Sequence, residues 1–462
     1  MDSSDKFSYQ QVLKAQLDFF NSNVTKSVKF RIVQLKKLKQ ILKENEALLD
    51  EAIYKDFKKG SFENYTTELS LLYHEIELGI KNVADWSSHS HVDTNLANMP
   101  GTSYIVPEPL GVCLVIGAWN YPYLLSIHPL ISAIVAGNTV VLKPSELAVN
   151  SSAIMAKLIN ENFDPNFIHV IEGGVEETTA LLKEKFDKIF YTGSSNVGKI
   201  VMHAAAEHLT PVTLELGGKS PTFVFNDAKL KITAQRIVWS KFLNCGQTCV
   251  APDYLLVEKG IKQKLIAEIK NQITAIHGSD PEKSEAFARI INKRHFDRIL
   301  KLIDSEKVVL GGDSNSENLY IAPTILDNVS FEDEVMQEEI FGPILPIIEF
   351  EDAEWAIKMV KVRPKPLALY AFTSSTKMSD RIVKEISFGG GVVNDAVMHL
   401  TNANLPFGGV GTSGMGNYHG KFGFDTFSHF KSVLKRSTLM EPPVKYPPYS
   451  DWKKSLLRWL ME

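Results

Sequence analysis

Residues 189–199 read IFYTGSSNVGK, an apolar run followed by a glycine turn and then by helical spacing through Val201, Met202 and Ala206. This order predicts a buried strand that ends in a turn and opens a helix. Backbone N–H groups at Gly193, Ser194 and Gly198 would favour a phosphate at such a turn. Because the segment lacks the G-x-G-x-x-G sequence, by itself it fits an ordinary helix start better than a dinucleotide site.

The same theme of apolar run and helix recurs on both sides of this segment. Further buried strands are predicted at 112–116, 139–142 and 167–171, with helices at 151–163 and 176–185 between them. A second alternating region runs from 217 to 394, with strands at 222–225, 254–257 and 367–373. Apolar strands that alternate with helices predict an α/β protein with doubly wound parallel sheets.

The remaining segments suggest how the chain divides into domains. Ile32, Leu35, Leu38, Ile41 and Leu42 repeat at helical spacing, so the first hundred residues read as helices. A polar, turn-rich stretch from 87 to about 101 follows, and we expect it to lead the chain out of the first domain. A length of 462 residues itself favours two or three domains.

Composition excludes several classes of protein. With 50 basic and 54 acidic residues the net charge is −4, and no basic block indicates a nucleic-acid partner. The polar segment 1–6 is unlike a signal peptide, and no apolar run is long enough to span a membrane. Three cysteines fit a reducing cytoplasm, and their spacing does not fit a zinc site. We therefore expect a cytoplasmic protein without a metal.

One cysteine is a candidate nucleophile. Cys249 stands in NCGQTCVAP (244–252), among Gln, Thr and Gly rather than within an apolar run. A thiolate there could attack a carbonyl if its pKa were lowered. The alternative for any cysteine is a small buried hydrophobic residue. We favour that structural role for Cys245, and we assign it to Cys113, which lies inside the apolar run 112–116.

Four polar residues could assist such a nucleophile or bind a cofactor. Glu215, between leucines and before Gly217-Gly218, would be desolvated at a strand end and suit a general base, unless it is a salt-bridged loop glutamate. Asn120 could donate its amide to an oxyanion, unless it only forms a turn. Lys143 and Glu146 follow a predicted strand, where they could bind sugar hydroxyls or be ordinary surface charges.

Taken together, these segments resemble the ordered motif set of the aldehyde dehydrogenase superfamily. The matching segments are AWNYP (118–122), KPSE (143–146), TGS (192–194), LELGGKSP (214–221), GQTC (246–249), QEEIFGP (337–343) and LPFGGVG (405–411). CVAPDY (249–254) and GMGNYHG (414–420) are closest to the class 3 branch, which acts on medium-chain, fatty and aromatic aldehydes.

The resemblance implies a fold with a Rossmann-like cofactor domain, an α/β catalytic domain and a small β element for bridging and oligomerisation. The corresponding bounds are 1–86 with 108–217 for the dinucleotide-binding domain, 218–398 for the catalytic domain, and 87–107 with 399–450 for the bridging element and tail. It also implies a homodimer. Since the chain ends without the apolar anchor of membrane-bound members, and begins without the longer leader of tetrameric relatives, we expect a soluble form.

The resemblance also implies roles for named residues. Cys249 would be the nucleophile that forms a thioester, Asn120 and the Cys249 N–H the oxyanion hole, and Glu215 the base that activates water. Lys143 and Glu146 would hold the adenosine ribose, and residues 193–198 would lie beside the pyrophosphate. Glu339 would bind the nicotinamide ribose, with Phe341 and Trp119 lining the cleft. NAD is the favoured cofactor, because Glu146 should repel the extra phosphate of NADP, and NADP is the alternative.

Two other functions remain open. A member of the same superfamily could pass the acyl group to an acceptor other than water, or run reductively, although Glu215 favours water. A non-catalytic binding or structural protein is the other alternative. The C-terminal Trp452, Leu456, Leu457, Trp459 and Leu460 recur at helical spacing. We expect a helix there that packs on a partner subunit or over the substrate mouth; contact with a membrane surface is the alternative.

Overall fold

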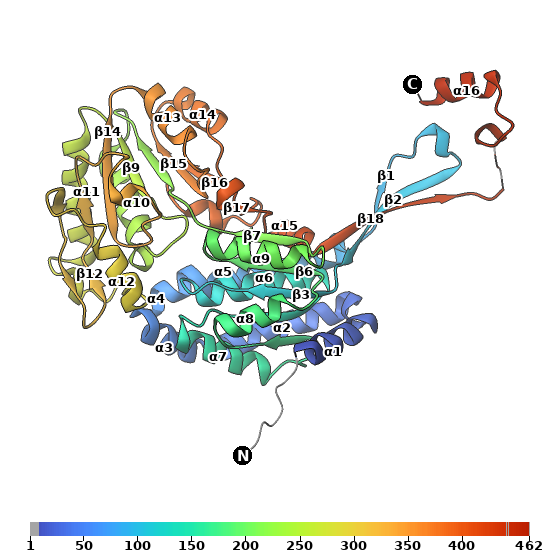
Figure 1. The fold of residues 1–462 in the computed structure, drawn as a ribbon, viewed down its shortest axis with the longest axis horizontal. Coiled ribbons are helices and arrows are strands. Elements are labelled where there is room, and N and C mark those ends of the chain that lie inside the picture. Colours follow the sequence, from blue (N-terminus) through green and yellow to red (C-terminus); the bar gives the residue numbers. More distant parts are fainter. Residues whose placement is uncertain (1–8, 440, 442, 462) are drawn as a thin grey trace, which may run out of the picture.

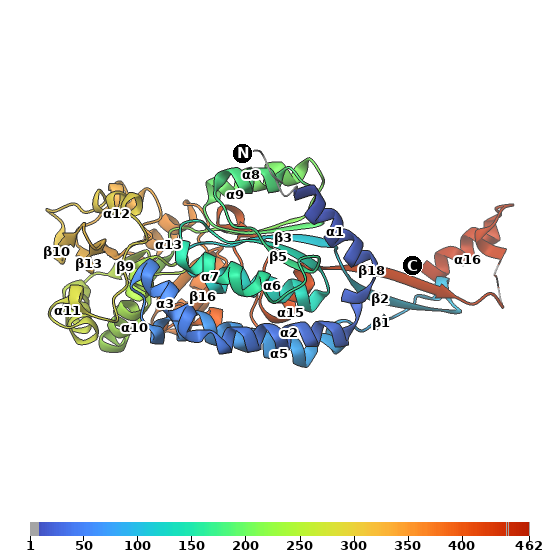
Figure 2. The same cartoon turned by 90° about the horizontal axis from the view of Figure 1, so that it is seen from below.

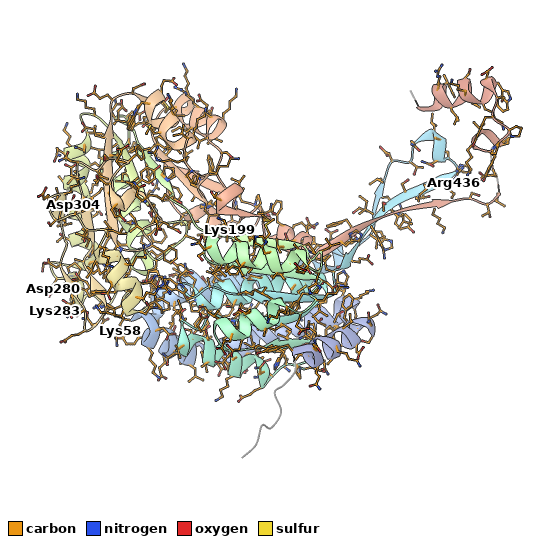
Figure 3. All side chains as sticks on the ribbon, viewed as in Figure 1. Lys58, Lys199, Asp280, Lys283, Asp304 and Arg436 are labelled. Carbon is orange, nitrogen blue, oxygen red and sulfur yellow. The ribbon has the colours of Figure 1, made fainter. Side chains whose placement is uncertain are left out.

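The computed structural model describes residues 9–439, 441 and 443–461, so the polar segment 1–6 lies outside the described residues. Two large sheets with their helices form the body, and a narrow three-stranded arm projects from it (Figure 1). The strands and helices alternate as the sequence predicts for an α/β protein. Charged side chains such as Lys58, Lys199, Asp280 and Asp304, labelled in Figure 3, are exposed on different parts of this body.

The first sheet has six strands in the order β17-β7-β6-β3-β4-β5. Its strands are β3 (Val112–Ile116), β4 (Thr139–Lys143), β5 (Ile168–Val170), β6 (Lys188–Thr192), β7 (Val212–Glu215) and the antiparallel β17 (Gly414–Met415). The other five strands are parallel. This confirms the parallel sheet predicted for this region, with strand ends within a residue or two of the predicted bounds.

Helices cover both faces of the first sheet because its strands are apolar on both sides. Cys113 and Val115 of β3 pack into the same core as the helices α2 (Val28–Glu44), α3 (Glu46–Phe57), α5 (Ser70–Trp86), α6 (Pro122–Ala136) and α7 (Val149–Asn160). Val112, Leu114 and Ile116 face a second core with α1 (Tyr9–Asn21), α8 (Val175–Leu182) and α9 (Ser195–Ala206). Figure 2 shows these two helical layers on opposite sides of the strands.

The second sheet has seven strands in the order β10-β13-β14-β9-β8-β15-β16. They are β8 (Pro221–Val224), β9 (Tyr254–Glu258), β10 (Val308–Leu310), β13 (Thr324–Leu326), β14 (Ile344–Phe350), β15 (Ala368–Phe372) and β16 (Gly390–Val393), parallel except for β10. The accompanying helices include α10 (Leu230–Phe242), α11 (Lys262–His277), α12 (Lys293–Leu300), α13 (Ala353–Lys361) and α14 (Thr376–Glu385).

The arm consists of β1 (Ser90–Val92), β2 (Gly101–Pro109) and β18 (Ser428–Arg436), which pair in antiparallel fashion. The predicted C-terminal helix is present as α16 (Asp451–Met461). It packs beside the short η3 turn (Leu96–Asn98) at the far end of the arm, away from the body of its own chain (Figure 1). The alternative in which this helix covers the substrate mouth of its own chain is therefore wrong.

Candidate active site

The predicted site residues of the first sheet gather along one edge. Lys143 is the last residue of β4, Glu215 is the last residue of β7, Gly193 directly follows β6, and Asn120 follows β3 by four residues. The carboxyl ends of parallel strands lie at the same edge of a sheet, where α/β proteins bind ligands. The fold therefore brings these four residues together although they span almost a hundred positions.

The second sheet supplies the remaining residues from the opposite direction. Cys249 lies in the loop before β9, and Glu339 and Phe341 lie in the loop before β14. A hydrogen bond of 3.0 Å from Asn120 Nδ2 to the carbonyl oxygen of Gln247 joins the loop after β3 to the loop before β9. Cys249 and Asn120 therefore meet between the two sheets.

Cys249 is partly buried at the end of a polar loop. The hydroxyls of Tyr121 and Thr248 share a hydrogen bond of 2.6 Å immediately before it. Burial raises the pKa of the thiol to about 12, and the nearby carboxyls of Glu339 and Glu215 add to the rise. The protein groups around this sulfur therefore raise the pKa of the thiol rather than lower it.

The other two cysteines are fully buried, as a structural role requires. Cys113 lies in β3 inside the core, and burial raises the pKa of its thiol. Cys245 lies in the turn before Cys249, and burial raises its pKa as well. The prediction that both thiols are buried is confirmed.

Glu215 is a buried carboxyl at the end of β7 and is 3% exposed. Neither of its oxygens has a hydrogen-bond partner within residues 9–439, 441 and 443–461. Burial raises the pKa of this carboxyl well above its usual value. The predicted position, desolvated at a strand end, is confirmed, and a salt-bridged loop glutamate is wrong. An unpaired buried carboxyl is costly, and such groups gather at functional sites.

Asn120 is buried, with 3% of its surface exposed, and it sits in the turn between β3 and α6. One hydrogen of its amide is donated to Gln247. An asparagine amide carries two hydrogens, so the second can be donated to a ligand oxygen. The residue thus occupies a turn and also holds its amide beside the loop of Cys249.

The two glycines of the turn after β6 lie close against side chains of the same domain. A Cβ at Gly193 would lie 2.2 Å from the Tyr191 hydroxyl, and a Cβ at Gly198 would lie 2.8 Å from the side chain of Leu216. Ser194 caps α9, because its side chain accepts the N–H of Val197 at 3.4 Å. The predicted strand, turn and helix are confirmed, and the φ of 157° at Gly193 favours glycine there.

Lys143 and Glu146 lie at the same edge of the first sheet, at and after the end of β4, which β3 separates from β6. The lysine is 1% exposed, donates to the carbonyl oxygen of Pro144 at 2.7 Å, and has its Nζ 3.9 Å from a carboxylate oxygen of Glu146. The Glu146 side chain is 44% exposed, so it can meet a ligand from solvent. Lys143 is not an ordinary surface charge, because it is buried at the end of β4.

Glu339, Phe341 and Trp119 form the opposite side of the site. A Cβ at Gly217 would lie 2.1 Å from Oε2 of Glu339, so the lack of a side chain at position 217 leaves the space that this carboxyl occupies. Burial, with a contribution from Asp253, raises the pKa of Glu339 to about 8. The rings of Trp119 and Phe341 meet edge to face with centroids 5.3 Å apart. These three residues, predicted from separate motifs, therefore share one wall.

Sequence reasoning missed several residues of this region. Hydrogen bonds around Cys249 are made by Asn244, Gln247, Tyr121 and Thr248. The ring centroids of His295 and Trp119 lie 5.0 Å apart. Asn244, Gln247, Tyr121 and Thr248 stand inside quoted motifs, which was the available signal, but His295 stands in none of them. Their partners are distant in sequence, so their roles could not be derived from spacing.

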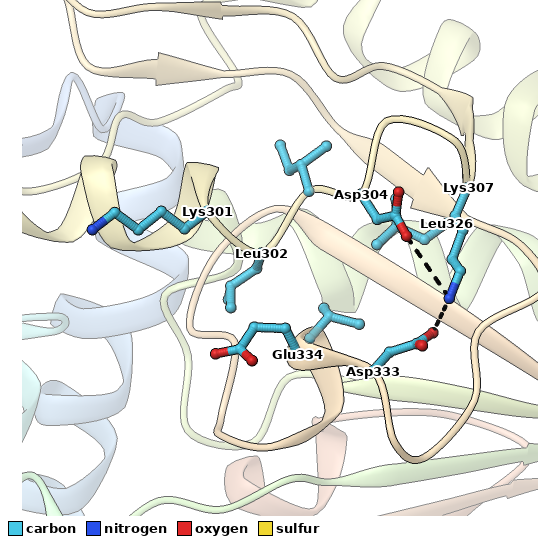
Figure 4. Close-up of a pocket in the computed structure, with 9 residues that line it drawn as sticks. Lys301, Leu302, Asp304, Lys307, Leu326, Asp333 and Glu334 are labelled. Carbon is cyan, nitrogen blue, oxygen red and sulfur yellow. Dashed lines mark hydrogen bonds and ion pairs between the residues drawn. The ribbon is translucent and has the colours of Figure 1, made fainter.

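Two cavities lie away from this region. One of about 120 Å³ is lined by residues that include Leu302, Lys307 and Asp333 (Figure 4), and another of about 310 Å³ lies between α3 and α7. Neither includes a predicted site residue. In the part of the chain that the structure describes, no cluster of three or more His, Cys, Asp or Glu side chains is placed to hold a metal ion. Within the same residues, no helix has the length and apolar character needed to cross a bilayer.

Comparisons with known proteins agree with this geometry. The model of the aldehyde dehydrogenase family matches residues 3–433. Aldehyde dehydrogenase family 3 member H1 of Arabidopsis thaliana is 50% identical over 96% of this chain and 93% of its own length. The dimeric NADP-preferring aldehyde dehydrogenase of Mus musculus is 48% identical over 93% of this chain and 96% of its own. The substrate-bound AldH of Staphylococcus aureus superposes with a TM-score of 0.96 at 46% identity, over 98% of this chain and 99% of that one.

Proposed function

Because the chain belongs to the aldehyde dehydrogenase family, we propose that Cys249, Glu215 and Asn120 are the residues that carry out its NAD(P)-dependent oxidation of aldehydes to carboxylic acids. The observation that supports this assignment is the meeting of three groups between the two sheets. They are a partly exposed thiol, a buried carboxyl without a partner among the described residues, and an amide with a hydrogen to donate.

The proposed reaction begins at the sulfur. The thiol proton leaves to water, and Sγ of Cys249 forms a bond with the carbonyl carbon of the aldehyde. The oxyanion that develops accepts hydrogen bonds from Asn120 Nδ2 and the Cys249 N–H. The chemistry that bound NAD(P) would supply here is an acceptor for the hydride of this carbon. Glu215 then takes a proton from water, the water oxygen attacks the thioester carbon, and the carbon–sulfur bond breaks to release the acid. A carboxylate with a raised pKa is a stronger base, which suits this step.

The cofactor would be held along the carboxyl edge of the first sheet. Lys143 and Glu146 would bind the adenosine ribose, and the turn of Gly193, Ser194 and Gly198 would accommodate the pyrophosphate. The position of this turn at the N-terminus of α9 supports this placement, because the N–H groups at a helix start favour a phosphate, and the missing Cβ of Gly198 lets α9 pack closely on Leu216. Glu339 would bind the nicotinamide ribose, with Phe341 and Trp119 beside the ring.

Glu146 is the proposed determinant that favours NAD over NADP. Its partly exposed carboxylate would repel the extra phosphate on the adenosine ribose. Glu146→Gln keeps a hydrogen-bonding side chain and removes the charge, so we expect the ratio of kcat/KM for NADP to that for NAD to rise by about 3- to 10-fold at low salt, and less at high salt. The kinetics of both cofactors at two ionic strengths measure this.

The control for this change is Glu161→Gln, at an exposed glutamate next to the end of α7. This variant should leave the ratio unchanged. An unchanged ratio in Glu146→Gln as well would show that the carboxylate does not lie near the ribose phosphate.

The resemblance to the class 3 branch and the family 3 relative support medium- or long-chain aliphatic and aromatic aldehydes as substrates.

We further propose a homodimer, as the name of the mouse relative states for that protein, with α16 packed on the partner subunit. The two large sheets and the arm support the domain division given above, with the cofactor domain around the first sheet and the catalytic domain around the second, although β17 from the segment 399–450 joins the first sheet. Three free cysteines fit a cytoplasmic location.

One experiment tests the assignment of Cys249 together with the activity. Purified protein is incubated with a short, a long and an aromatic aldehyde, each with NAD and with NADP. We expect carboxylic acid and reduced cofactor in equal amounts, and we expect iodoacetamide to stop the reaction by modifying Cys249, with aldehyde slowing that modification. Modification of Cys249 that leaves oxidation intact would refute the proposed nucleophile. If no aldehyde gave reduced cofactor, the result would favour the alternative of a non-catalytic binding protein over an enzyme.

A further inference from the structure

A turn of left-handed backbone directly precedes the loop of Cys249. Asn244, Cys245 and Gly246 have φ values of 51°, 55° and 73°, and all three residues are buried. A left-handed residue other than glycine costs about 1–2 kcal/mol, although asparagine adopts this conformation more readily than most. A Cβ at position 246 would lie 2.3 Å from the carbonyl oxygen of Gly342, so the turn also packs tightly against the loop before β14. Contacts around the turn must therefore hold it in place.

Asn244 makes those contacts with both its side chain and its backbone. Its Nδ2 donates to the backbone oxygen of Asn120 at 2.7 Å and to that of Gln247 at 3.2 Å. Its backbone N–H donates to Oε1 of Glu63, from the first helical region, at 2.8 Å. One buried side chain thus connects the turn before Cys249 with the loop after β3.

The Gln247 oxygen is the point where these contacts reach Asn120. This oxygen accepts hydrogen bonds from the side chains of both Asn244 and Asn120. The side chain of Gln247 is fixed in turn by donating to the backbone oxygens of Asn244 and Arg289, both at 3.0 Å, and by accepting the N–H of Ile291 at 3.0 Å. Asn244 therefore fixes the backbone of Asn120 and also the acceptor that orients the Asn120 amide.

From this arrangement we propose that Asn244 is a positioning residue for the oxyanion site, which holds the Asn120 amide at its working distance from Cys249. The inference rests on the proposed role of Asn120. Oxyanion donors act within a narrow range of distance, and a displacement of about 0.5 Å already weakens such a site. Asn244 itself touches neither the aldehyde nor the sulfur in this scheme.

Two reactions of the same thiol separate positioning from general damage. p-Nitrophenyl acetate acylates the sulfur: Sγ bonds to the carbonyl carbon through an oxyanion, p-nitrophenolate leaves, and the thiol proton goes to water. Iodoacetamide alkylates the same sulfur by displacement of iodide and forms no oxyanion. Both reactions need the same thiolate, so the ratio of the two rate constants removes the change in thiol ionisation that they share and leaves the contribution of the oxyanion site.

Asn244→Gly is the main variant, because glycine tolerates the left-handed turn and only the amide is lost. Its acylation-to-alkylation ratio should fall at least about tenfold, while Asn120→Ala should lower the same ratio by about 10²–10³. Asn244→Asp, which also removes both amide hydrogens, is the second variant. In the Asn120→Ala background, Asn244→Gly should change the ratio by less than about twofold, because the group it positions is gone.

Asn138→Asp is the matched control. Asn138 is as buried as Asn244, and its Nδ2 also donates to two backbone oxygens, of Ala133 at 3.2 Å and Phe427 at 2.9 Å. It lies before β4, at the other end of the sheet, so its variant should lose stability and keep the ratio. An unchanged ratio in both Asn244 variants, or independent effects in the double variant, overturns the positioning role. An unchanged ratio in Asn120→Ala instead overturns the oxyanion role of Asn120.

Discussion

Replacing Cys249 by serine should lower kcat for aldehyde oxidation by at least about 10³-fold. A serine hydroxyl ionises far less readily than a thiol, and the burial and carboxyls that raise the pKa of Cys249 to about 12 would suppress its ionisation further. The substitution changes one atom, so the site geometry should persist. Steady-state formation of reduced cofactor measures the loss, and thermal unfolding checks that the fold is intact.

Cys113→Ser is the matched control for this change. It makes the same exchange at a fully buried cysteine of β3, outside the proposed site. We expect kcat within about twofold of the unchanged protein, with some loss of stability because a hydroxyl is buried in the core. If Cys249→Ser retained activity comparable to that of Cys113→Ser, covalent catalysis at position 249 would be wrong.

Several strands of the two large sheets were predictable because they are buried on both faces. Runs such as 112–116 and 254–257 are continuously apolar, and they occur as strands at almost the predicted residues. The arm was not predictable in the same way. β2 and β18 pair along nine residues each across more than 300 positions, and most of their side chains are only partly buried or exposed. No local periodicity specifies such a pairing.

The composition of the site was predictable from motifs, whereas its electrostatics was not. Glu215 and Lys143 end strands, so the parallel sheet brings them to one edge. The raised pKa of Cys249 depends on burial and on carboxyls contributed by two other segments, which no single motif contains. The contact of Asn244 with Asn120 likewise joins residues 124 positions apart. Asn244 lies in a quoted motif, so the sequence drew attention to this residue, but it did not indicate which residue Asn244 contacts.

The last prediction concerns the second half of the reaction. Glu215→Gln keeps the shape of the side chain and removes the base, so water attack on the thioester should slow and steady-state turnover should fall by about 10²–10⁴. The first turnover should persist, because the attack of Cys249 and the loss of hydride do not need this carboxyl in the proposed scheme. Rapid mixing should therefore show one equivalent of reduced cofactor, followed by a slow phase. Intact-mass analysis should show the protein carrying the acyl group.

A second buried glutamate tells this effect apart from a general loss of buried charge. Glu75 is 5% exposed but has partners, since its oxygens meet Nε2 of His128 at 3.3 Å and the N–H of Gly420 at 2.9 Å. Glu75→Gln should reduce stability without accumulating an acyl group, because Glu75 is paired, whereas Glu215 has no partner among the residues that the structure describes. Should Glu215→Gln lose its first turnover as completely as its steady state, the carboxyl would act before the thioester forms. Water activation would then not be its main task.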